Sequence, residues 1–380
     1  MAARSAGAGR NRAELPGRPS GYGVRATERT RGAAVAEWSD GGPGGAAAAP
    51  GGRRRRRSRL LRRLLVGLVV LSLAAGVLLW FNRDRLTVPP EGCRITTAAG
   101  SGTLDLAQAA NAATITSVAL SRGLPERAVT IALATAMQES KLHNLVGGDR
   151  DSIGLFQQRP SQGWGTAAQI QDPVYATNKF LDGLVKIQGY ARMPLTDAAQ
   201  QVQKSGYPQA YAKHESNAML VSSVLTGREP AALNCVVHEL DDPVADASGS
   251  PTPSSAVSAV PAAAPPSSAA QRSQAVTDRV RREFGRVVAV APATKAAKDP
   301  RTVLALSPQA AASTGSDDLR QSGWAVAQWA VAQAQVLGIG TVAYDGQVWR
   351  FDRPSDGWKP QSADAPSDRV LLTLGAPAKT

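Results

Sequence analysis

One acidic side chain near the middle of the chain, Glu139, has the surroundings that acid catalysis requires. It ends a stretch that reads as an apolar helix, and helical spacing puts it on one face with the small side chains of Ala132, Thr135 and Ala136. We expect a carboxyl group in this position to be half-buried. Loss of water favours the protonated form of a carboxyl group, which makes it a usable general acid near neutral pH.

Most glutamates at helix ends are ordinary solvated surface residues. The residues that follow Glu139 distinguish it from these. Ser140 comes directly after it, then a glycine-rich loop, and then the turn Ser152-Ile153-Gly154-Leu155-Phe156-Gln157. This order resembles the signature of the lytic transglycosylases of the lysozyme superfamily, which cut the glycan of peptidoglycan. Their Glu-Ser pair is followed, after a loop, by a Gly-Leu-Met-Gln-like segment, and Phe156 stands here in place of the usual Met. The resemblance covers about residues 125–230.

The resemblance implies a role for each matching residue. Glu139 would be the catalytic acid and base, Gln157 a polar group lining the sugar site, and Ser140 a supporting residue of the motif. The family's later Ala-Tyr-Asn segment is not kept, because the nearest stretch is Ala210-Tyr211-Ala212. Tyr211 is therefore the candidate partner that orients Glu139.

The number of carboxylates bears on the mechanism. The resemblance implies that one Glu protonates the glycosidic oxygen and then takes a proton from the 6-hydroxyl of the sugar, so that a 1,6-anhydro product forms. A hydrolytic glycosidase normally needs a second carboxylate. Asp149 and Asp151 are close enough in sequence to supply it, although turn residues are the more ordinary interpretation of acids in a glycine-rich loop.

Other binding chemistry is weakly indicated. Trp164 lies between Gly163 and Gly165, where its ring could face a sugar or anchor the loop against the core. The acids around residue 150 lack the spacing of a calcium-binding EF-hand loop, and the three histidines do not form a helical zinc pair. We expect no metal site and no cofactor.

The elements that must position these residues are mostly helical. Five helices are expected in a domain spanning residues 93–238, over residues 104–122, 125–142, 172–187, 196–205 and 209–226. Strand signals are almost absent there. The sequence therefore predicts an all-α domain within a mainly α chain, and the resemblance implies that this domain is lysozyme-like.

The chain's two cysteines, Cys93 and Cys235, lie almost at the two ends of that domain. We expect them to form a disulfide, because the domain follows a membrane helix on the side where disulfides persist. In the chain-entropy model, closing a loop of this length stabilises the fold by about 4–5 kcal/mol.

A second segment beyond the first domain has the composition of a folded unit. Residues 239–271 are rich in Pro, Ala and Ser and read as a disordered linker. Residues 272–360 are expected to form a small α+β domain, with a helix over 317–337 and two strands around Asp345-Gly346. This segment loosely resembles C-terminal modules of actinobacterial cell-wall proteins, and we expect a binding or positioning role. Residues 361–380 are expected to be a disordered tail.

The N-terminal part predicts the location of the protein. Residues 1–63 are expected to be a disordered cytoplasmic tail, and residues 64–82 a single transmembrane helix. Eight arginines within residues 53–63 place the N-terminus in the cytoplasm and the rest of the chain outside the plasma membrane. A cleaved signal peptide is the alternative, but its apolar region is typically shorter and nearer the N-terminus.

The charge distribution bears on possible partners. Residues 1–63 carry +11 of the formal net charge of +13, which is better explained by membrane topology and anionic lipids than by nucleic acid. The expected partners are peptidoglycan glycan strands and the plasma membrane. The alternative function is a non-catalytic module that binds the cell wall or another partner.

Overall fold

The computed structural model describes residues 52–86, 89–205, 209–240, 269–293, 303–309, 316–361 and 365–375. They belong to two units, which are treated separately: an N-terminal helix, and a compact unit that begins at Asp84. The predicted linker over 239–271 and the first 51 residues of the predicted tail lie almost wholly outside the described residues.

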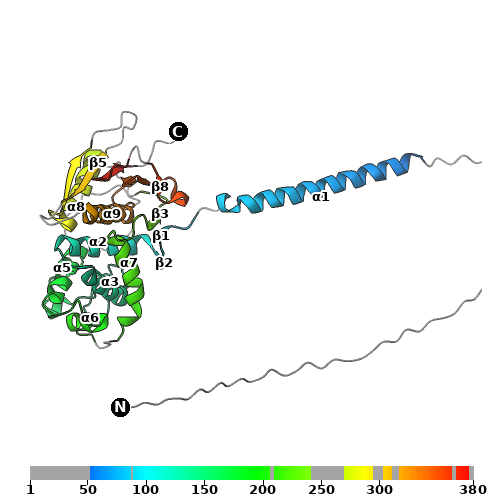
Figure 1. Ribbon diagram of the computed structural model, residues 1–380. Coiled ribbons are helices and arrows are strands. Elements are labelled where there is room, and N and C mark those ends of the chain that lie inside the picture. Colours follow the sequence, from blue (N-terminus) through cyan, green and yellow to red (C-terminus); the bar gives the residue numbers. More distant parts are fainter. Residues whose placement is uncertain are drawn as a thin grey trace, which may run out of the picture. The chain divides into compact units, whose positions relative to one another are not determined.

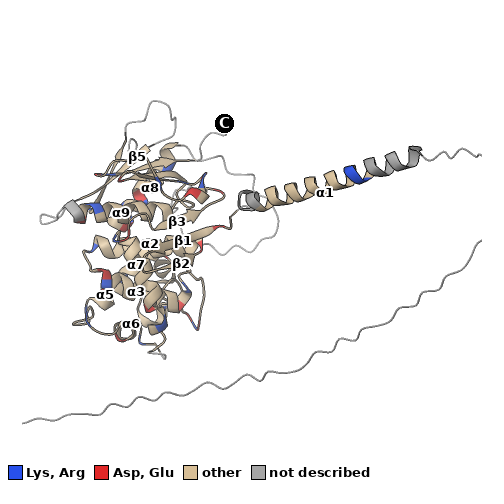
Figure 2. Ribbon diagram, turned by 45° about the vertical axis from the view of Figure 1, so that its right-hand side comes forward, with Lys and Arg blue, Asp and Glu red and all other residues tan. Residues whose placement is uncertain are grey.

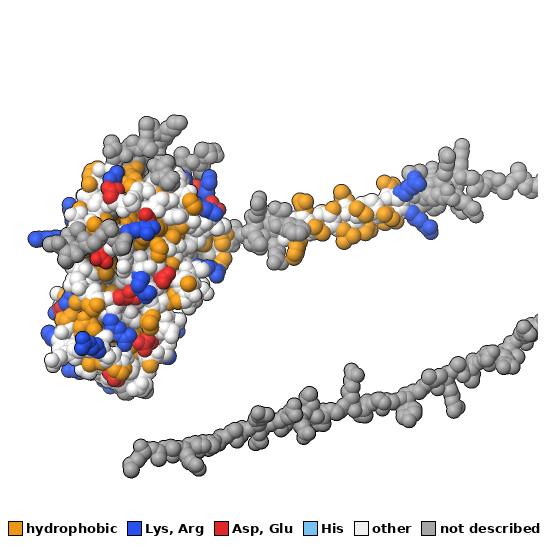
Figure 3. Space-filling model, viewed as in Figure 1, with side chains coloured by type: hydrophobic (Ala, Val, Ile, Leu, Met, Phe, Trp, Pro, Cys, Tyr) orange, Lys and Arg blue, Asp and Glu red, His pale blue; other side chains and the backbone are white. Residues whose placement is uncertain are grey.

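The described residues of the N-terminal unit belong to one long helix, α1 (Gly52–Leu86), which ends three residues beyond the boundary at Arg83. Its stretch Leu61–Trp80 has 20 residues, a mean hydropathy of 2.2 and exposed side chains, which Figure 3 shows as a run of apolar groups. Its described basic side chains stand at one end of that stretch (Figure 2). The prediction of one apolar helix of membrane-spanning length is confirmed. The prediction of disorder up to residue 63 is wrong for residues 52–63, because the helix already begins in the arginine-rich segment.

The first part of the compact unit is a group of helices around an apolar core (Figure 1). They form close to the predicted positions, with one additional short helix, α4. Their bounds are α2 (Leu106–Ser121), α3 (Glu126–Ser140), α4 (Ala167–Ile170), α5 (Pro173–Leu184), α6 (Leu195–Gln203) and α7 (Glu215–Leu225). Asp105 caps α2 and Asp172 caps α5, each by accepting a backbone N–H with its side chain.

The same part also contains a small antiparallel sheet, so the prediction of an all-α domain is wrong. The sheet has the order β2-β1-β3 and is built from β1 (Gly92–Thr97), β2 (Gly100–Leu104) and β3 (Leu233–Val236). Cys93 lies opposite Cys235 on the paired strands β1 and β3, and the two form the predicted disulfide. The sheet and the disulfide thus join the two ends of this part.

The second part of the compact unit is a six-stranded antiparallel sheet with two helices, α8 (Ala269–Phe284) and α9 (Ser316–Ala332). The strand order is β4-β5-β9-β6-β7-β8. The strands are β4 (Val288–Pro292), β5 (Val303–Pro308), β6 (Ile339–Tyr344), β7 (Gln347–Arg350), β8 (Lys359–Pro360) and β9 (Val370–Leu374). The predicted strands around Asp345-Gly346 are confirmed as β6 and β7.

Strand β9 corrects the prediction of a disordered tail over residues 361–380. It pairs with β5 on one side and with β6 on the other, and so lies inside the sheet. Its alternating Val370, Leu372 and Leu374 are buried. The described end of the chain is therefore an integral part of the core.

The two parts pack against each other through α2, α8 and α9, and Figure 1 shows α8 and α9 between the large sheet and the helices of the first part. Glu283 of α8 is fully buried at this contact. It accepts hydrogen bonds from Thr114 Oγ1 (2.8 Å) and Ser117 Oγ (2.7 Å) on α2, and from Trp329 Nε1 (2.6 Å) on α9, and it pairs with Arg279. One carboxylate thus connects three helices from both parts.

Candidate active site

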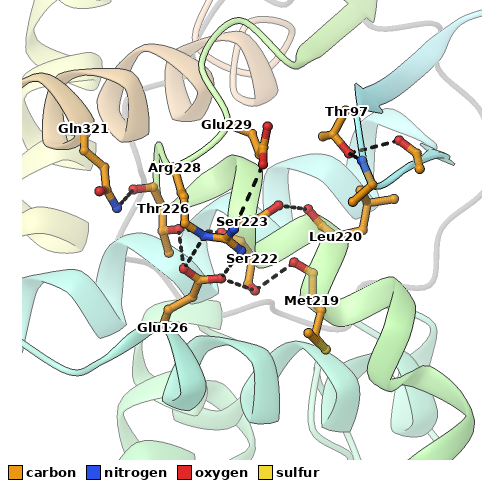
Figure 4. A network of polar contacts seen from close by, with 12 residues as sticks. Thr97, Glu126, Met219, Leu220, Ser222, Ser223, Thr226, Arg228, Glu229 and Gln321 are labelled. Atoms are coloured by element: carbon orange, nitrogen blue, oxygen red, sulfur yellow. Dashed lines mark hydrogen bonds and ion pairs between the residues drawn. The ribbon is translucent and has the colours of Figure 1, made fainter.

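Helix α3 carries Glu139 at its C-terminal end, and a polar network fixes its other end (Figure 4). Glu126, in the first turn, accepts two hydrogen bonds from Arg228, at 3.0 Å from Nε and 2.9 Å from Nη2. This contact raises the pKa of Arg228. Ser222, on α7, donates to Glu126 at 3.4 Å and shares a hydrogen bond with Thr130 at 2.9 Å. These hydrogen bonds therefore attach the N-terminal part of α3 to α7 and to Arg228, which follows it.

The helix stops directly after Glu139 and Ser140. Lys141 and Leu142 both have left-handed backbone conformations, with φ of 54° and 63°, and their amides bond back to Met137 and Ala136. Two side-chain amides of α2 also hold this turn. Gln108 donates to Lys141 O at 2.9 Å, and Asn111 donates to Leu142 O at 2.8 Å. These contacts define where the helix ends and so where Glu139 stands.

Glu139 is partly buried, as expected from its apolar helix, and among the described residues its carboxylate has one hydrogen-bond partner. The hydroxyl of Tyr211 donates to Glu139 Oε1 at 2.7 Å. Tyr211 is almost fully buried, and burial together with the neighbouring Glu139 raises its pKa, so that the phenol keeps its proton. Tyr211, the candidate partner named from the sequence, thus contacts the carboxylate directly.

A groove of about 680 Å³ lies beside Glu139. Its lining is mainly polar and comes from the end of α3, the loop between α3 and α4, and the end of α6. The lining residues are Gln138, Glu139, Asp149, Ser152, Gln157, Gln158, Arg159, Gln162, Trp164, Val202, Gln203, Lys204 and Ser205. Glu139, Gln157 and Trp164, singled out in the sequence, therefore meet in one groove.

Gln157 reaches the groove from a tight turn. Its own φ is 46°, an unusual value for a residue other than glycine, and its side-chain amide donates to Gly154 O at 3.1 Å. Gly148 makes room for it, because a Cβ at that position would overlap the Gln157 carboxamide. The glycine-rich loop and the turn therefore fit together at this amide.

Ser140 and Phe156 stand behind the groove. The Ser140 hydroxyl is buried and donates to Leu155 O at 2.7 Å, which ties the turn to α3. Phe156 is fully buried and stacks on Phe180 of α5, with ring centroids 4.7 Å apart. Neither they nor Tyr211 line the groove, so these residues position the site and do not form its surface.

The two aspartates of the loop, Asp149 and Asp151, lie in different environments. Asp151 accepts from Arg159 Nε at 2.7 Å and from the Ser161 backbone N–H at 2.8 Å, and these contacts lower its pKa far below the usual range. It holds the loop in shape. Asp149 is exposed and lines the groove, which leaves it as the second carboxylate beside Glu139.

Two further contacts define the surroundings of the groove. Trp164 is partly buried against the core, and its carbonyl oxygen accepts from the Tyr175 hydroxyl at 3.2 Å. Gln138, another lining residue, shares a hydrogen bond of 3.1 Å with His214, which lines a second cavity of about 460 Å³. Burial, with a contribution from Lys213, lowers the pKa of His214 and favours the neutral ring.

The remaining lining residues could hardly be predicted from the sequence. Gln203 and Lys204 belong to the end of α6, nearly fifty residues beyond the turn, and Gln203 Nε2 donates to Phe156 O at 2.8 Å. The sequence of a polar helix end does not indicate which distant segment it will contact in the fold. Only the Gly206 that follows indicated that a helix ended there.

Comparisons with known proteins concern the second part of the compact unit. No curated protein gives a significant match to the chain. Residues 267–369 match the family model described as VldE, C-terminal domain, a segment that runs from the start of α8 nearly to β9 and does not include the groove.

Proposed function

We propose that this protein is a membrane-anchored enzyme that cleaves the glycan strands of peptidoglycan, with Glu139 as the general acid and base. The observation that carries the proposal is the partly buried Glu139 at the edge of a polar groove, hydrogen-bonded to Tyr211 and accompanied by Gln157. The motif resemblance to lytic transglycosylases over residues 125–230 supplies the substrate class.

The proposed reaction needs no second carboxylate. Protonated Glu139 gives its proton to the glycosidic oxygen as the bond from that oxygen to C1 of the muramyl sugar breaks, while the acetamido oxygen of the same sugar stabilises C1. The carboxylate then takes the proton of the 6-hydroxyl, whose oxygen bonds to C1. The product is a 1,6-anhydro sugar, and Glu139 is protonated again.

A hydrolytic mechanism would instead require a base that activates water. Asp151 is unsuited to this role because Arg159 and Ser161 already hold its carboxylate. Asp149 is the carboxylate that a hydrolase would use. The preference for the lyase route comes from the motif resemblance, and the mass of the products distinguishes the two.

The membrane topology fits a substrate outside the cell. The 20-residue apolar stretch of α1 would anchor the chain in the plasma membrane, with its arginine-rich flank in the cytoplasm. The Cys93–Cys235 disulfide fits an oxidising compartment for the compact unit.

Release of soluble fragments from purified, dye-labelled peptidoglycan by the full-length chain in detergent micelles tests the proposal. An enzyme of this kind releases dye in proportion to time and to enzyme concentration. A non-catalytic wall-binding protein would sediment with the peptidoglycan and release none.

Tyr211→Phe is expected to lower kcat about 10-fold and to leave KM nearly unchanged, because Glu139 loses the donor that orients it. The cost in stability is expected to be about 1 kcal/mol, the usual value of one hydrogen bond. Tyr344→Phe is the matched control, since this buried tyrosine also donates one hydrogen bond, to Arg320 O at 3.1 Å, in the second part. Equal losses of kcat in the two variants would contradict the orienting role.

Gly148→Ala is expected to weaken glycan binding several-fold, because the new methyl group displaces the Gln157 carboxamide from its place. The fold should tolerate the change at a cost of about 1 kcal/mol, since the flexible Gln157 side chain can move away and Ser152 O, at 3.0 Å from the new Cβ, needs only a small shift. Gly147→Ala is the control, because a Cβ there meets no atom within 4 Å. Sedimentation with peptidoglycan and thermal unfolding compare the two, and identical binding would contradict the proposed role of Gln157.

A further inference from the structure

The charged side chains that line the groove differ in whether a side chain of opposite charge pairs with them. Glu139, Asp149, Arg159 and Lys204 line it. Arg159 is neutralised by Asp151, with Nε 2.7 Å from the carboxylate. Lys204 makes no ion pair with any residue in the described part of the chain, and its side chain is exposed. The following residues, Gly206, Tyr207 and Pro208, carry no acid that could pair with it.

The backbone that carries Lys204 is fixed on both sides. Its φ is 53°, and its N–H donates to Gln200 O at 2.7 Å as the cap of α6. The side-chain amide of Gln200 donates to the backbone carbonyl oxygen of Ser205 at 2.7 Å, and Gln200 Oε1 accepts from Ser205 Oγ at 2.9 Å. Gln203 ties the same helix end to the turn through Phe156 O. These contacts hold the backbone of Lys204 at the wall of the groove, from which its side chain can reach a bound ligand.

We propose that Lys204 binds a carboxylate of the substrate, so that the groove selects amino-sugar strands that carry acidic substituents over neutral amino-sugar polymers. The inference rests on the proposed function for the identity of the strand. Glu139 and Asp149 would repel an acidic group elsewhere in the groove, so the same charge arrangement also sets the register in which a strand binds. The peptide stems of peptidoglycan carry such carboxylates, and chitin, with the same type of sugar backbone, carries none.

The test compares the binding of two probes to the full-length chain in detergent micelles. One probe is a tetrasaccharide of peptidoglycan with its peptide stems, and the other is the neutral tetrasaccharide of N-acetylglucosamine. All proteins carry Glu139→Gln, so that the probes stay intact during calorimetry. We expect tighter binding of the acidic probe, and a loss of about 3- to 10-fold for that probe alone in Lys204→Gln.

Three further variants make the result specific. Lys204→Arg keeps the charge and should retain the preference. Lys204→Gly removes the charge and suits the left-handed backbone, so a loss there does not come from misfolding. Lys186→Gln removes an exposed lysine that does not line the groove and should change nothing. Raising the salt from about 0.05 M to about 0.5 M should also reduce the preference.

The outcomes separate this inference from the proposed function. Equal affinity for the two probes, or equal losses for both in Lys204→Gln, would overturn the inference while turnover of peptidoglycan by the wild type stood. A preference that depends on Lys204, without any turnover by the wild type, would uphold the inference and remove only the enzymatic assignment.

Discussion

Glu139→Gln is expected to reduce the turnover of peptidoglycan roughly 10³-fold or more and to leave binding almost unchanged. An amide has nearly the shape of the carboxyl group but cannot give or take the proton that the reaction needs, and general acid-base catalysis contributes about 10²–10⁴-fold. The amide oxygen can still accept the hydrogen bond from Tyr211, so the fold should not change. Initial rates of dye release and sedimentation with peptidoglycan measure the two properties.

Glu215→Gln is the matched control for that variant. Glu215 stands in the first turn of α7 and pairs with Arg127 at 2.8 Å, away from the groove. Its loss should change stability by no more than about 1 kcal/mol and leave turnover intact. If Glu139→Gln kept more than about a tenth of the wild-type rate, the carboxylate would not be the general acid.

Glu283→Ala is expected to destabilise the compact unit by about 3–5 kcal/mol. The substitution leaves Arg279 without its partner and removes the acceptor of Thr114, Ser117 and Trp329 in a buried interface. Because these donors belong to both parts, we expect one unfolding transition at a lower temperature. Circular dichroism of the full-length chain in micelles records it.

Asp278→Asn is the control on the same helix. Asp278 is exposed and contacts Gln274 and Arg281 at the surface of α8, so its change should lie within about 0.5 kcal/mol. Two separate transitions in Glu283→Ala, with only the second part losing stability, would show that the parts fold independently. Hydrogen exchange in α2 provides a second measurement, because it should rise together with exchange in α9.

Helices were predictable from the sequence because their signals are local. Apolar spacing, Asp172-Pro173 at the start of α5 and Gly123 after α2 located them to within a few residues, apart from α7, which begins at Glu215. The sheet β2-β1-β3 was missed because β1 pairs with β3 across a separation of more than 130 residues, and both strands are short. Strand β9 did carry an alternating pattern, but it lies after a stretch rich in Pro, Asp and Ser that reads as a tail.

The candidate site was predictable as far as its motif extends. Glu139 and Gln157 meet in the groove as the motif implies, and Tyr211 contacts Glu139 although its segment is incomplete. Lys204 and Glu283 could not be found in this way. Each is a charged residue on an amphipathic helix, and only the tertiary neighbours decide that one faces the groove and the other is buried.

Mass spectrometry of the fragments that the wild-type chain releases from purified peptidoglycan in ¹⁸O-labelled water tests the central claim most directly. Cleavage with Glu139 as the only acid and base predicts glycan fragments that end in an anhydro sugar, lighter by one water than hydrolysis products and free of the label. Incorporated ¹⁸O would replace the lyase route by hydrolysis. Glycan strands that remain uncut, or the same fragments from Glu139→Gln, would contradict the account.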